Sequence, residues 1–368
     1  MVNAGDQLRP SALGSIEELR IIATILLVAF HVIGQPDSGL RLSEGHPARF
    51  IVDLGASFRM PAFAFVAGFI YCLRPPTRGS MVSFLRGKVR RIAVPGLIAA
   101  ALFGSAAYLL GTRFGIPPQE LWELIFFPYA HFWFLQAVLV MFIVVGLADI
   151  ALDHRGHWPM FFASLVLALW PPPLPRLFAM PHALQLAPFF IFGMGVYRSW
   201  DWVSAHARAI VPLAAVATLL AFSAAFHDYI LLNTSPQKGI ASSLLLGMSL
   251  SVLILLCWPH HPQARKIGQF SFTIYLYHVF ATAGTRMGLN ALGVDALWIH
   301  LPLGTAAGIL APVALHLVLL KVPVIGPLML GLRTKTGGQN YEAVSQTLTR
   351  HTQAIATRAV ETKLTGRN

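Results

Sequence analysis

The sequence predicts an all-α protein, a polytopic bundle of about ten transmembrane helices. The 368-residue chain is 56% hydrophobic, with a mean hydropathy of +0.64. Only 11% of its residues are charged, whereas soluble domains usually carry about 25%. Its apolar runs are continuous rather than alternating, which argues against a β-barrel. A soluble fold with so few charges would expose large apolar patches, so the composition excludes most soluble enzymes of this size.

A spanning helix needs roughly 20 mostly apolar residues, and ten runs come close to this length. The first, fifth and sixth runs are short and are the weakest members of the set. In chain order, the runs are Leu19–Gly34, Ile51–Tyr71, Ile92–Gly111, His131–Ile150, Trp158–Trp170, Leu184–Tyr197, Ala209–Phe226, Ile240–Trp258, Phe270–Thr285 and Leu301–Leu320.

The basic residues predict how the bundle is oriented. With the amino terminus in the cytoplasm, 20 of the 27 Lys and Arg residues fall on the cytoplasmic side, as the positive-inside rule requires. The seven on the opposite side are Arg41, Arg49, Arg59, Arg113, Arg176, Lys238 and Arg286. We therefore expect an even number of spans in the cell (plasma or inner) membrane, with both termini cytoplasmic. Residues 1–332 would form the membrane domain and residues 333–368 a weakly ordered cytoplasmic tail.

The formal net charge of +12 fits contact with anionic lipid better than nucleic-acid binding, because no basic stripe is interleaved with stacking aromatics. Cys72 and Cys257 are too few for a disulfide framework and match no zinc or redox motif. The pair His260-His261 has no third ligand beside it, so we expect no metal. The first apolar run lacks a small-residue cleavage site, which predicts a retained helix rather than a signal peptide.

Two ionisable residues, Arg20 and His31, lie in the first predicted helix, eleven positions apart. Eleven helical residues rise about 16 Å and return to within about 20° of the same face. A long anionic cofactor could then lie along this face, with its phosphate end at Arg20 and its reactive end near His31. Histidine suits proton removal near neutral pH. The alternative is that Arg20 snorkels to the interface and His31 caps a helix end among headgroups.

A basic segment precedes the third predicted helix and contains Arg86, Lys88, Arg90 and Arg91. Arginine forks match phosphate geometry, so this segment could clamp the phosphates of a cofactor. It could equally be an ordinary cytoplasmic anchor of the kind that the positive-inside rule describes.

Six further residues are candidates for a polar substrate path: Arg59, His131, Trp133, Ser271, Tyr275 and His278. The last three fall at helical spacing on one side of the ninth predicted helix. Each has an ordinary alternative. Arg59 lies beside Met60-Pro61 in a segment that also reads as a helix-packing motif, Trp133 could be an interfacial belt residue, and His278 could be a satisfied histidine of the bundle.

Five segments, in order, resemble motifs of acyltransferase family 3, and the closest branch is the fucose 4-O-acetylase-like acetyltransferases. These segments are Glu18-Leu-Arg20 through His31, Ser57-Phe-Arg59-Met60-Pro61 through Gly68-Phe69, Lys88-x-x-Arg91-Ile-x-x-Pro95, His131-x-Trp133-Phe134-Leu135, and Ser271 through Ile274-Tyr275-Leu-Tyr277-His278. The resemblance implies a bundle of about ten helices that transfers an acyl group, often acetyl, from acyl-CoA to a hydroxyl of a sugar, glycan or small molecule. It also implies that His31 is the base and that Arg20, Lys88 and Arg91 handle acyl-CoA.

The sequence departs from the family pattern at several of these positions. Glu18 replaces a commoner Asp, Arg59 replaces a His, Ala67 replaces the Ser of a Ser-Gly pair, and Lys88 replaces an Arg. The changes at Arg59 and Ala67 could shift acceptor preference. The soluble esterase-like domain that some members carry at the carboxyl end is not found in this sequence.

Three functions follow from these patterns. The first is O-acyl transfer with His31 as general base. The second is a transporter or flippase of a sugar-linked or acylated substrate, for which Pro61 and Pro188 would supply broken helices, although no internal repeat is visible. The third is a non-enzymatic membrane scaffold. The resemblance favours the first.

Overall fold

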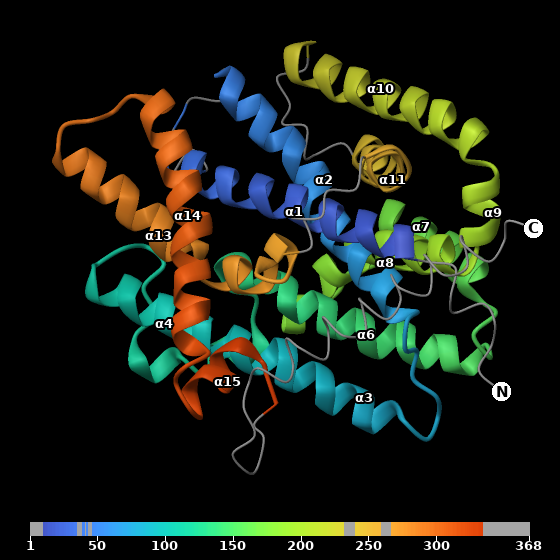
Figure 1. Ribbon diagram of the computed structural model, residues 1–368, viewed down its shortest axis with the longest axis horizontal. Helices are drawn as coiled ribbons and strands as arrows, with labels where there is room; N and C mark the ends of the chain where they lie inside the picture. The colour runs from blue at the N-terminus through green and yellow to red at the C-terminus, as the bar shows by residue number, and fades with distance from the viewer. Residues whose placement is uncertain are drawn as a thin grey trace, which may run out of the picture.

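The computed structural model describes residues 10–34, 39–40, 42, 46–231, 240–258 and 266–333, and the regular elements in these ranges are all helical (Figure 1). The longer helices are α1 (Pro10–Ile33), α2 (Pro47–Tyr71), α3 (Met81–Lys88), α4 (Val94–Leu109), α6 (Trp133–Ala151), α7 (His157–Leu169), α8 (Met180–Arg198), α10 (Ala207–Leu231), α11 (Ile240–Cys257), α13 (Ser271–Ala291) and α14 (Leu297–Leu319). The short elements are the π-helix η2 (Val89–Ala93), the 3₁₀ turns η3 (Pro118–Glu120), η4 (Ala130–Phe132) and η5 (Leu177–Ala179), and the helices α5 (Glu123–Phe126), α9 (Trp200–Ala205) and α15 (Ile325–Leu330).

Each of the ten predicted apolar runs falls largely within a helix. Within the described ranges, however, seven helices are both long and apolar enough to cross a membrane. Helix α7 has only 13 residues, which is shorter than a bilayer crossing needs. The count of about ten spans and the cytoplasmic position of both termini remain predictions. The tail predicted over residues 333–368 lies outside the described residues except for Arg333.

Helices α2 and α8 pack backbone against backbone in the centre of the bundle. A Cβ atom at Gly68 would overlap the carbonyl of Phe190, and one at Gly193 would overlap the carbonyl of Phe65. Small residues allow this close approach, and it is the usual device by which helices associate in lipid. Gly68 therefore marks a packing position of α2.

A buried carboxylate joins three helices at one end of the bundle. The Asp149 side chain of α6 is fully buried and accepts two hydrogen bonds of 2.7 Å from the Arg198 guanidinium of α8. It also accepts one of 2.9 Å from the Tyr71 hydroxyl of α2. His154 Nδ1 lies 2.7 Å from the same carboxylate. Because a bidentate Arg–carboxylate pair has fixed geometry, this network holds the carboxyl ends of α2, α6 and α8 together.

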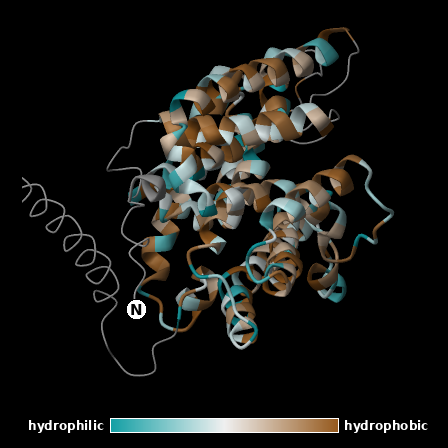
Figure 2. Ribbon diagram, turned by 90° about the vertical axis from the view of Figure 1, so that its right-hand side faces the viewer, coloured by the Kyte–Doolittle hydropathy of each residue, from teal (hydrophilic) through white to brown (hydrophobic). Residues whose placement is uncertain are grey.

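The outer helices expose apolar side chains. Only 17% of the most apolar stretch of α10, and the same share of α14, is buried. Figure 2 shows hydrophobic residues along most helices and hydrophilic residues at many helix ends and turns. Figure 1 shows α10 at the edge of the molecule, packed on α11. An apolar exterior of this kind suits lipid rather than water.

Candidate functional site

A cavity of about 1560 Å³ opens on one side of the bundle. Its walls come from the carboxyl-terminal halves of α1, α4 and α13 and from the amino-terminal halves of α2, α8, α11 and α14. Smaller parts of the lining come from the described residues between α1 and α2, the loop after α4, the turn before α6, the end of α7 and the loop before α14. All of these segments lie at the same ends of antiparallel helices, so the cavity faces away from the Asp149 network.

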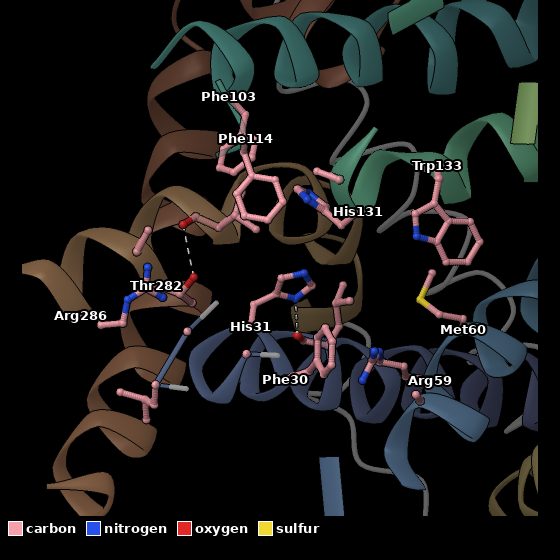
Figure 3. Close-up of a pocket in the computed structure, with 18 of the residues that line it drawn as sticks. Phe30, His31, Arg59, Met60, Phe103, Phe114, His131, Trp133, Thr282 and Arg286 are labelled. Atoms are coloured by element: carbon pink, nitrogen blue, oxygen red, sulfur yellow. Dashed lines mark hydrogen bonds between the residues drawn. The ribbon is translucent and has the colours of Figure 1, made fainter. Parts of the chain in front are cut away.

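Two histidines meet at the wall of this cavity. His31 near the end of α1 lines the cavity, and its Nδ1 atom lies 3.0 Å from Nε2 of His278 on α13. His131 of η4 lies beside both, with ring centroids 5.4 Å from His31 and 5.2 Å from His278. Figure 3 shows the His31 and His131 rings approaching one another, with Trp133 and Met60 farther along the same lining. Three residues predicted separately from the sequence are thus brought into one cluster.

The hydrogen bonds of these rings assign their tautomers. His278 Nδ1 lies 2.9 and 3.0 Å from the carbonyls of Ile274 and Tyr275. Carbonyls only accept, so Nδ1 of His278 carries the proton and Nε2 of the neutral ring is an acceptor. His31 Nδ1, which also lies 2.9 Å from the Leu27 carbonyl, therefore donates to that carbonyl and to His278. The lone pair of His31 then resides on Nε2, the atom that a base needs.

His131 and Tyr275 form the next layer around this pair. The Tyr275 hydroxyl donates a hydrogen bond to the backbone carbonyl of His131, which ties η4 to α13. Within the described part of the chain, the buried Nε2 atom of His131 has no hydrogen-bond partner. Burying a polar atom without a partner costs free energy. His131 lines the cavity, so this atom is available to a bound molecule.

Arg59 of α2 is the buried cation of the cavity. Its side chain is 7% exposed, and its guanidinium carbon lies 3.6 Å above the Phe30 ring centroid. Phe30 lies between Arg59 and His31 in Figure 3, and its ring centroid is 5.0 Å from that of His31. Trp133 lines the cavity and packs on His182, with ring centroids 4.5 Å apart.

The remaining predicted residues lie away from the cavity. Arg20 forms a 3.0 Å salt bridge with Glu17 in the first half of α1. It does not line the cavity that His31 lines, so the structure does not bring the two into one groove. Ser271 is buried at the start of α13 and is also outside the lining.

The basic segment forms the last residues of α3 and the π-helix η2, at the end of α4 opposite the cavity. Lys88 Nζ lies 3.6 Å above the Phe142 ring centroid and 4.9 Å above that of Phe84. The buried Nε atom of Arg90 has no hydrogen-bond partner among the described residues. Arg86 and Arg91 are exposed. π-Helical turns are rare in proteins, and those that occur are often found at functional sites. The π-helix η2 therefore distinguishes this segment from an ordinary helix start.

Several lining residues were not singled out from the sequence as site residues, namely Phe103, Arg113, His182, Gln185, Arg286 and Asp295. No motif covers these positions: Arg113 and Asp295 lie in loops, and the other four lie in α4, α8 and α13. One signal was present: Arg113 and Arg286 belong, with Arg59, to the minority of basic residues on the side opposite the predicted cytoplasmic face.

The fold and the site define a polytopic helical membrane protein with a histidine cluster at a large cavity. The model of the acyltransferase domain family matches residues 13–317. The chain therefore belongs to acyltransferase family 3 and is a multi-pass membrane acyltransferase. No curated protein and no solved structure matches the chain.

Proposed function

We propose that the protein transfers an acyl group, acetyl in the first instance, from acyl-CoA to a hydroxyl of a sugar, glycan or related acceptor. The fucose 4-O-acetylase-like branch is the subtype that we propose. The observation that carries the proposal is the His31–His278 pair at the cavity wall, because its tautomers leave a basic nitrogen beside a space large enough for an acceptor. No observation in the described part of the chain favours a transporter.

His31 and His131 have different roles in the proposed reaction: His31 is the general base, and His131 stabilises the oxyanion. His31 Nε2 removes the proton from the acceptor hydroxyl, whose oxygen then forms a bond to the thioester carbon. The carbon–sulfur bond breaks, and the proton passes to the departing thiolate. In the tautomer that carries its proton on Nε2, the atom without a partner among the described residues, His131 donates to the oxyanion that develops, which is the usual way to stabilise such a transition state. The surrounding helices exclude water that would hydrolyse the thioester.

The basic segment is the proposed site for the phosphates of acyl-CoA. Arg86, Lys88, Arg90 and Arg91 lie just before α4, at the end of α3 and in η2, and the unsatisfied Nε of Arg90 fits an anionic ligand. The cavity borders the other half of α4, beginning at Phe103, which is about 14 Å along the helix from Val94 at 1.5 Å per residue. We therefore propose that the donor and the acceptor enter from opposite faces of the cell membrane, with the basic face toward the cytoplasm. Arg20 remains a proposal for donor handling on that cytoplasmic side.

The test is acetyl transfer from labelled acetyl-CoA in membranes that contain the protein or its His31→Ala variant. We expect a fall of about 100-fold or more in turnover, the usual contribution of a general base. His227→Ala, at an exposed position on α10, is the matched control and should keep full turnover. Mass spectrometry of glycans and glycolipids, with and without the protein, should show a difference of one acyl group. Unchanged transfer by the His31 variant would remove the base from the mechanism.

A further inference from the structure

The cavity has an excess of positive charge. Among the described lining residues, three arginines (Arg59, Arg113 and Arg286) face a single acid, Asp295. All three arginines belong to the minority of basic residues on the side opposite the predicted cytoplasmic face. Basic residues are disfavoured in non-cytoplasmic loops. Their gathering around one cavity therefore indicates a local use for the charge.

Arg59 carries the argument further because it is buried in the middle of a helix. Its side chain is 93% shielded, at 7% exposure, and its Nε atom has no hydrogen-bond partner within the described ranges. The nearby carboxylate of Asp53 is engaged by Arg49, whose Nε donates to it over 3.0 Å. No salt bridge within the described ranges satisfies the Arg59 guanidinium. Phe30 packs against the face of this group and accepts no hydrogen bond from its N–H groups.

Burying a guanidinium with an N–H donor that has no partner costs free energy, unless a bound ligand accepts that hydrogen bond. Its planar fork matches carboxylate and phosphate oxygens, which accept two parallel hydrogen bonds. The Phe30 ring fixes the plane of the fork by stacking. Because Phe30 also lies beside His31, an anionic group held at Arg59 would be close to the base.

We propose that the acceptor is an anionic hydroxyl compound, whose carboxylate or phosphate group binds Arg59 while a neighbouring hydroxyl faces His31. This inference rests on the proposed acyltransferase reaction and names its acceptor class. Arg113 and Arg286 add long-range attraction at the cavity wall. Arg59 is then a specificity-determining residue.

The experiment compares three probes: methyl β-D-glucoside, methyl β-D-glucuronide and glucose 1-phosphate. The first is neutral, the second carries a carboxylate and the third carries a phosphate. Comparing the two anionic probes shows whether the site prefers a carboxylate or a phosphate. Binding is measured by calorimetry on purified protein in neutral phosphatidylcholine nanodiscs. It uses the His31→Ala variant, so it does not depend on acyl transfer. Transfer to each probe is then measured with wild-type protein and acetyl-CoA.

We expect at least one anionic probe to bind about 10- to 100-fold more tightly than the glucoside, the range for a charge-assisted pair. Arg59→Gln should remove this difference, and Arg59→Lys should restore part of it. Arg155→Gln, at an exposed loop position, should change nothing. Equal binding of all probes, or failure of both anionic probes to bind, would overturn the inference.

The measurements of acetyl transfer test the proposed reaction separately from the proposed acceptor class. Anion-selective binding without any acetyl transfer would contradict the reaction and leave the charge selectivity standing. Transfer to the neutral and anionic probes with the same KM would contradict the selectivity alone. If Arg59 instead stabilised the reacting oxyanion, Arg59→Gln would lower kcat equally for every probe, and the inference would fall.

Discussion

His278 Nε2 accepts a hydrogen bond from His31 Nδ1 over 3.0 Å, although 247 residues separate the two rings in the chain. Two backbone carbonyls of α13 orient the His278 ring, so helix α13 determines which nitrogen of His31 is basic. A histidine held in one tautomer by a second group is a recurring arrangement in enzymes that activate a hydroxyl.

His278 is therefore a positioning residue, and its removal should slow the reaction without abolishing acceptor binding. We expect His278→Phe to lower kcat by about 10- to 100-fold, since outer-layer partners of a reactive group contribute on this scale. His278→Gln should recover part of the loss, because its amide oxygen can still accept from His31. The dependence of kcat on pH should also change in His278→Phe. Equal kcat for the Phe and Gln variants would mean that the ring only fills space.

His131 should act mainly on the transition state. We expect His131→Phe to lower kcat by about 10²- to 10³-fold with little change in KM, as for loss of one oxyanion donor. His131→Gln keeps an N–H donor and should retain more activity. His206→Phe, at an exposed position on the carboxyl side of α9, is the control. A rise in KM with unchanged kcat would assign His131 to acceptor binding instead.

The basic segment should respond to the charge of the donor. We expect Lys88→Ala and Arg90→Ala each to raise the KM for acetyl-CoA by about 10-fold, the loss of one charge-assisted contact. Neither change should affect the KM for S-acetyl-pantetheine, which lacks the nucleotide phosphates. Arg74→Ala, on the exposed loop after α2, should resemble the wild type. Equal effects on both donors would show that the segment only anchors the helix.

Gly68 should be the most sensitive packing position of α2. Gly68→Ala places a methyl group against the Phe190 backbone of α8, and overpacking of this kind costs about 1–3 kcal/mol. Gly55→Ala is the matched control, because a Cβ there meets nothing within 4 Å and alanine favours helix. We expect a lower melting temperature in detergent for the first variant only. Equal melting curves would show that α2 and α8 can move apart without cost.

The positions of the helices could be predicted from the sequence because the length of an apolar run reports on a membrane crossing. The histidine cluster could be predicted only in parts. His31, His131 and His278 each stood out as a polar residue in an apolar segment, but their meeting depends on how α1, η4 and α13 pack. Sequence spacing within one helix could not give that contact.

Arg20 shows the limit of the same reasoning. Helical spacing placed it on the face of His31, yet its guanidinium binds Glu17 one turn away and does not line the cavity. A flexible arginine can turn toward a nearby carboxylate whatever face its Cα occupies. Arg113 lies in the loop after α4 and Arg286 in the second half of α13. Tertiary packing alone brings these two residues to one cavity.

The Asp149 network has a mechanical consequence. It fastens α2, α6 and α8 at one end through Tyr71 and Arg198, while the other ends of α2 and α8 border the cavity. Widening the entrance for a bulky molecule would therefore swing these helices about a hinge at the carboxylate. The largest displacement would occur at the mouth, and the fastened end would stay nearly still.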